Sequence, residues 1–170
     1  MTKGNQRKRI QVSSIVVDAI AHEARQFAEG GRRCLGDRKH GTAPGPIGPG
    51  IVCMTFSVEL WLKALGCMSY PTGDVPTGHD LFVLFNGLSK EIQDALVARC
   101  GQPRENLLQV LREDARAFET WRYTFEQQAL QPGSKDGLVV MTVHLLLTDH
   151  LPTVCDQVYE EFKAAHAATP

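Results

Sequence analysis

Apolar residues recur every three or four positions along most of this chain, a spacing that predicts α-helices, and no alternating stretch of strand length occurs. Breaks between these stripes divide the chain into six predicted helices at about residues 13–29, 51–65, 79–88, 89–100, 103–128 and 138–165. Pro152 should kink the last helix near Thr148, because proline removes a backbone hydrogen bond and clashes with the preceding turn. The pattern therefore predicts an all-α fold, an up-and-down bundle of four longer helices with a short helical pair inserted.

Residues 30–50 are rich in glycine and proline, and this density of helix breakers predicts a long loop without regular structure. Gly30 and Gly31 should end the first helix, and Gly66 the second. The predicted loop is also basic, with Arg32, Arg33, Arg38 and Lys39. Residues 1–12 are polar and basic and are predicted to be a disordered arm, which leaves residues 13–166 as one folded domain.

The predicted helix at 51–65 is apolar on nearly all sides, which is typical of a central, buried helix. Three polar residues interrupt it at i, i+4 and i+8, namely Thr55, Glu59 and Lys63. Glu59 followed by Lys63 is the favourable order for an ion pair within a helix. Two interpretations stay open: this edge faces water, or it forms a polar cluster inside the bundle.

A second anomaly lies on the predicted helix 103–128, where Arg122 occupies a position of the apolar stripe. An arginine that faces a core needs a carboxylate, because an unpaired buried charge is very costly. Glu59 is the distant candidate and Glu126 the local one. Alternatively, Arg122 extends its charged end to the surface while its stem packs. We hypothesise a Glu59–Arg122 pair between two helices.

His79 and Asp80 follow a glycine at the predicted start of a short helix. Asp80 in the first turn suits the helix dipole. His79 either caps this helix or lines a cleft beside Glu59 and Lys63, although a single histidine is more often structural than catalytic.

Composition limits the function further. The 170 residues fit one domain, and the net charge of −1 is uneven: residues 1–40 hold nine Lys/Arg against four Asp/Glu, and residues 41–170 hold nine against fifteen. The basic end either contacts nucleic acid or an acidic partner, or is a solvated tail. Five cysteines without paired spacing indicate reduced thiols in a cytoplasmic protein, and no signal peptide, membrane span, phosphate loop, metal motif or cofactor is predicted.

Three ordered motifs, SVELWLKALG, GHDLFVLFNGLSKEIQDAL and FETWRYTFEQ, resemble a bacterial branch of the HEPN superfamily over most of residues 51–130. The resemblance implies a helical bundle that commonly dimerises. It also implies RNA cleavage, a toxin–antitoxin or phage-defence role, or assistance to a nucleotidyltransferase, so that RNA or a nucleotide and a nucleotidyltransferase or antitoxin protein are the expected partners. The positions that match this branch are Glu59, Lys63, His79, Asp80, Trp121, Arg122, Tyr123 and Glu126.

Active HEPN ribonucleases carry an arginine and a histidine with four to six residues between them near the start of a late helix, and this chain lacks that pair there. Arg33 and His40, with six residues between them, meet the spacing formally, but they lie in the predicted loop. The sequence thus favours an RNA- or nucleotide-binding module without the usual catalytic pair. One alternative is a metal-independent ribonuclease, in which His79 or His40 is the base and a cation such as Lys63 or Arg122 stabilises the charged phosphorane. The other is a structural or interaction protein.

Overall fold

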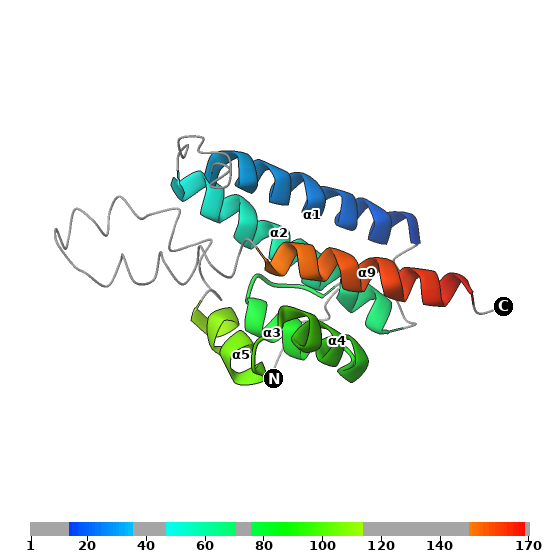
Figure 1. The fold of residues 1–170 in the computed structure, drawn as a ribbon. Helices are drawn as coiled ribbons and strands as arrows, with labels where there is room; N and C mark the ends of the chain where they lie inside the picture. The colour runs from blue at the N-terminus through cyan, green and yellow to red at the C-terminus, as the bar shows by residue number, and fades with distance from the viewer. Residues whose placement is uncertain (1–13, 36–46, 71–75, 114–149, 169–170) are drawn as a thin grey trace, which may run out of the picture.

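The computed structural model describes residues 14–35, 47–70, 76–113 and 150–168, and all regular structure within these ranges is helical (Figure 1). Its helices are α1 (Ser14–Leu35), α2 (Ile47–Ser69), α3 (Leu81–Asn86), α4 (Lys90–Cys100), α5 (Arg104–Glu113) and α9 (Leu151–Ala167). The all-α prediction is confirmed for these ranges, and a helical bundle fits them. In Figure 1, α1, α2 and α9 run side by side, with α3, α4 and α5 beneath them.

Among the described helices, α1 and α2 form the most extensive contact. Two glycines allow these helices to approach closely. A Cβ atom on Gly31 would lie 2.6 Å from Cγ of Met54, and one on Gly50 would lie 2.8 Å from Cγ of Leu35. The prediction that Gly30 and Gly31 end the first helix is therefore wrong. α1 continues to Leu35, because packing against α2 outweighs the low helix propensity of glycine, about 1 kcal/mol per residue.

α2 is longer than predicted at both ends, since it begins at Ile47 and passes through Gly66 to Ser69. Pro49 is tolerated because it lies in the first turn, where its missing N–H removes no helical bond. Gly66 lies inside this helix, and a Cβ at this position would lie 2.4 Å from Cγ of Pro76, so a larger residue would require Pro76 to move. The predicted loop 30–50 is thus helical at both of its ends, and residues 36–46 lie outside the described ranges.

The predicted short helical pair is present as α3 and α4. The carboxylate of Asp80 accepts a hydrogen bond from the amide of Val83 at 3.0 Å and caps α3. Ser89 caps α4 in the same way, and Gly101 ends α4 in the left-handed conformation, φ 61°. Local capping chemistry therefore sets the bounds of both helices.

The last two predicted helices are described only in part. α5 ends at Glu113 in the described ranges, and residues 114–149 lie outside them. Pro152 occupies the first turn of α9, which begins at Leu151. Pro152 is therefore not interior to α9, and a proline in a first turn disrupts no hydrogen bond within the helix. The kink predicted near Thr148 lies outside the described residues.

α2 is the central helix of the described core. Its Trp61 packs against Tyr159 of α9, with ring centroids 5.5 Å apart, and both residues are almost fully buried. Among the described residues, the segment Pro49–Ser69 is long and apolar enough to span a membrane, with a mean hydropathy of 1.5, but 67% of it is buried inside the protein. This burial is what the core helix of a soluble protein shows.

Candidate functional site

The structure brings Glu59, Lys63 and His79 together. Glu59 belongs to the central helix α2, and its side chain is only 3% exposed. Nζ of Lys63, one turn later, lies 2.6 Å from Oε1 of Glu59, and Nδ1 of His79 lies 3.0 and 3.1 Å from the two carboxylate oxygens. Two donors from different segments therefore share one buried carboxylate. We call these three residues the Glu59 cluster.

His79 is the exposed member of the Glu59 cluster, since 68% of its side chain is exposed against 16% for Lys63. It lies in a bend after Gly78, whose φ of 106° favours glycine. Because a carboxylate only accepts hydrogen bonds, Nδ1 carries the proton in this contact. Nε2 of the same ring has no hydrogen bond to any described residue, so it is the atom of the cluster that can meet a ligand.

Two other predicted members of the site have different roles. The carboxylate of Asp80 is used as the cap of α3. Thr55 lies one turn before Glu59 on α2, is 4% exposed, and its hydroxyl has no hydrogen-bond partner within the part of the chain that the structure describes. A buried hydroxyl without a partner costs folding free energy, so Thr55 adds no stabilising contact to the cluster.

The remaining predicted residues are only partly described. Trp121, Arg122, Tyr123 and Glu126 lie outside the described ranges, as do Arg38, Lys39 and His40, so the Glu59–Arg122 pair stays a prediction. Arg32 and Arg33 are in the last turns of α1 rather than in a loop. Both bond the carboxylate of Glu29, at 3.2 and 2.8 Å, so one negative charge is shared by two positive charges at this end of the helix.

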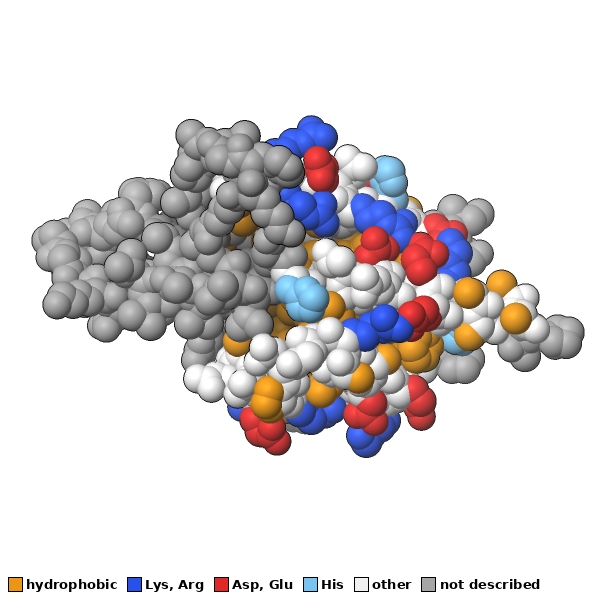
Figure 2. Space-filling model, viewed as in Figure 1, with side chains coloured by type: hydrophobic (Ala, Val, Ile, Leu, Met, Phe, Trp, Pro, Cys, Tyr) orange, Lys and Arg blue, Asp and Glu red, His pale blue; other side chains and the backbone are white. Residues whose placement is uncertain are grey.

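An ionic seam between α1 and α9 was not predicted. Arg25 donates to Asp156 at 2.6 Å and to Glu160 at 2.5 Å, while Asp18 accepts from Tyr159 at 2.6 Å and from Lys163 at 2.5 Å. The hydrogen bond to Asp156 raises the pKa of Arg25, and those from Lys163 and Tyr159 lower the pKa of Asp18. Figure 2 shows the resulting mixture of blue and red side chains on this face of the molecule. In the sequence, the only sign of this ionic seam is the i, i+4 spacing of Asp156 and Glu160 on one helix.

A second unpredicted feature joins α5 to α3. The guanidinium carbon of Arg112 lies 4.3 Å from the centroid of the Phe82 ring. Arg112 is exposed and Phe82 is partly buried. Phe82 lies three residues after His79, on α3, and Arg112 lies on α5.

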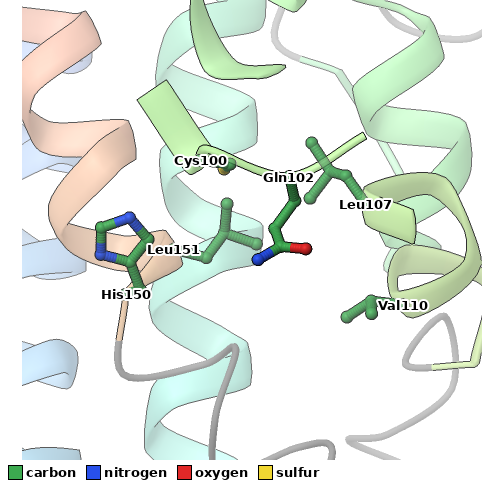
Figure 3. Close-up of a pocket in the computed structure, with 6 residues that line it drawn as sticks. All are labelled: Cys100, Gln102, Leu107, Val110, His150 and Leu151. Atoms are coloured by element: carbon green, nitrogen blue, oxygen red, sulfur yellow. The ribbon is translucent and has the colours of Figure 1, made fainter. Parts of the chain in front are cut away.

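A shallow cavity opens between α4, α5 and α9, with an empty volume of about 300 Å³ that includes open solvent. Figure 3 shows the amide of Gln102 near its centre, with Leu107 and Val110 on one side and His150 beyond Leu151 on the other. Burial raises the pKa of the Cys100 thiol to about 11, so this thiol is not an activated nucleophile. No group of three or more potential metal ligands occurs among the described residues.

Comparison with known proteins adds no assignment, because no protein-family model, curated protein or solved structure matches this chain.

Proposed function

We propose that the protein is a HEPN-like module that binds RNA or a nucleotide, and that His79 is its contact with a phosphate oxygen. The observation that carries this proposal is the hydrogen bond between the exposed ring of His79 and the buried carboxylate of Glu59. This bond holds the ring in one orientation, with Nε2 free to donate to an anion when the ring is protonated. An ordered ring loses little entropy when a ligand binds.

The charge of the Glu59 cluster also supports an anionic ligand. Lys63 neutralises Glu59 at 2.6 Å, so a phosphate that approaches His79 does not face an isolated negative charge. With His79 neutral the cluster carries no net charge, and with His79 protonated it carries +1. Following the family resemblance, we propose a cytoplasmic homodimer that works with a nucleotidyltransferase or an antitoxin protein in a toxin–antitoxin or defence system.

One observation favours a second candidate, a metal-independent ribonuclease. A carboxylate that accepts from Nδ1 leaves the lone pair on Nε2, which is the arrangement of a general base. Nε2 of His79 would then accept the proton of a 2′-hydroxyl as that oxygen attacks phosphorus. Lys63 already bonds Glu59, so a further cation, for which Arg122 is the candidate, would stabilise the charged phosphorane.

Fluorescence anisotropy with a labelled single-stranded RNA tests the binding proposal. The wild type should bind, and its affinity should fall with salt because phosphate contacts release counterions. His79→Ala should weaken binding at least about fivefold, which is the loss of one charge-assisted hydrogen bond. His22→Ala is the matched control, since His22 is an exposed histidine of α1 and should bind RNA as the wild type does.

The same RNA on denaturing gels separates the two candidates. Cleavage by the wild type that is lost in His79→Ala selects the ribonuclease, and parallel tests of His40→Ala and Arg122→Lys show whether those residues contribute. Binding without cleavage selects the binding module. If the wild type neither binds nor cleaves RNA, both proposals fail and a structural or interaction role is left.

A further inference from the structure

The stack of Arg112 on Phe82 differs from the other arginine sites of the described structure. Five described arginines bond a described carboxylate: Arg25, Arg32, Arg33, Arg99 and Arg104. Arg112 forms no ion pair with a carboxylate of the described side chains, although it is exposed. Its charge is therefore not neutralised within the part of the chain that the structure describes.

Arg104 provides an internal comparison. Its guanidinium also lies over a phenylalanine ring, 5.5 Å from the centroid of Phe85. The Phe85 ring is only 1% exposed, and Arg104 also bonds Gln93 and Asp94. Both partners of this stack therefore already make contacts within the protein. The Phe82–Arg112 stack is closer, at 4.3 Å, its arginine is exposed, and within the described residues this guanidinium has no carboxylate partner.

We propose that the Phe82–Arg112 stack is a platform for one unstacked base of a single-stranded RNA. The base would lie on the outer face of the guanidinium, as unpaired bases do on arginine planes and aromatic rings in RNA-binding proteins. His79 precedes Phe82 by three residues, so the two proposed contacts, one to a phosphate and one to a base, come from the same short stretch of chain. This inference rests on the proposed RNA binding and names its substrate class, because a duplex offers no free base face.

Three probes test the platform by anisotropy: a single-stranded RNA, the same backbone with abasic positions, and the corresponding duplex. The wild type should prefer the intact single strand about tenfold over the other two, since one stacked base contributes roughly that much. Arg112→Ala should lose most of this preference. The DNA version of the single strand shows whether the 2′-hydroxyl contributes as well.

Arg112→Lys separates stacking from charge. Lysine keeps the positive charge but not the planar group, so the salt dependence of binding should be retained while the preference for intact bases is lost. Lys90→Ala is the matched control, because it removes one exposed positive charge from α4 and should leave the preference unchanged. Should Arg112→Ala fail to fold, Phe82→Leu removes the ring while keeping an apolar side chain, and it should lose the same preference.

The outcomes distinguish this inference from the function on which it rests. If the wild type binds RNA but binds abasic and intact strands equally, or if Arg112→Ala and Phe82→Leu keep the wild-type preference, the platform is wrong while RNA binding stands. If the wild type binds none of the probes, both are overturned.

Discussion

Replacing Glu59 with glutamine preserves the shape of the side chain and removes the charge that Lys63 and His79 share. Glutamine keeps one oxygen with two lone pairs, but it replaces the second carboxylate oxygen with an amide nitrogen that cannot accept a hydrogen bond. In the wild type, Nζ of Lys63 lies 2.6 Å from one carboxylate oxygen and Nδ1 of His79 lies 3.0 and 3.1 Å from both, so His79 loses one acceptor and both donors lose the negative charge. Lys63 is the costlier loss, because its side chain is only 16% exposed and its charge would have no counterion within the cluster.

The size of the effect follows from this burial. Breaking a buried ion pair by removing one partner typically costs about 3–5 kcal/mol. The long stem of Lys63 allows its ammonium to move toward water, which reduces the cost. We therefore expect Glu59→Gln to lower the free energy of unfolding by about 2–3 kcal/mol, a large share of the total of about 5–15 kcal/mol that is usual for a domain. The melting temperature should fall by roughly 5–10 °C.

Urea unfolding followed by far-UV circular dichroism measures this loss. Glu29→Gln is the control, because Glu29 also bonds two basic side chains on a helix, but its own side chain is 47% exposed. Its effect should lie within the error of the curves, as is usual for exposed ion pairs. If the two variants are equally stable and their m-values match the wild type, the argument from burial is wrong.

A double-mutant cycle in the same assay tests the pair of Glu59 with Arg122. The cycle compares Glu59→Gln, Arg122→Met and the double variant. A coupling energy of at least about 1 kcal/mol indicates that the two side chains interact, and additive effects indicate that they are apart.

The other predictions use neighbouring residues of similar chemistry as their own controls. Gly30→Ala should raise the free energy of unfolding by about 0.5–1 kcal/mol, because no atom lies within 4 Å of the added Cβ. Gly31→Ala should lower the free energy of unfolding, because its Cβ would lie 2.6 Å from Cγ of Met54. Thermal melts of the two variants measure this difference. Thr55→Val should leave the free energy of unfolding unchanged or raise it, because it removes a buried hydroxyl that has no partner among the described residues. Ser57→Ala should lower it by about 1 kcal/mol, because the Ser57 hydroxyl donates to a carbonyl of α1 at 2.7 Å. Asp18 has a lowered pKa when folded, so its ionised form stabilises the protein above the ordinary carboxyl pKa of 3.8, and this stabilisation is lost as the pH falls. Asp18→Asn should therefore be less stable than the wild type in urea at pH 7, and the difference should shrink as the pH falls below 3.8.

Features of the fold that depend on local chemistry could be predicted from the sequence. The caps of α3 and α4, Asp80 and Ser89, bond amides three residues ahead, so their effect is visible in a short stretch of sequence. Gly31 could not be interpreted in this way. Whether a glycine ends a helix or allows a second helix to approach depends on Met54, which is distant in the sequence.

The same distinction applies to the candidate site. Glu59 and Lys63 are one helical turn apart, so their contact follows from helix geometry alone. His79 was a candidate because of its motif, but its distance to Glu59 depends on how the chain returns after α2. The Phe82–Arg112 stack and the seam between α1 and α9 join helices that no local pattern relates, and neither was predicted.

In the Glu59 cluster, one hydrogen bond joins a buried carboxylate to an exposed imidazole. The two residues are therefore expected to have different roles, His79 in binding and Glu59 in holding the ring. His79 is mostly exposed, so its replacement removes few packing contacts and should leave the unfolding curve nearly unchanged. Glu59 is buried, so its replacement should affect both stability and the orientation of the ring. A variant that weakens RNA binding at wild-type stability would therefore identify His79 as the contact with the ligand. Glu59 would then be the residue that positions it, because its loss reduces binding and stability together.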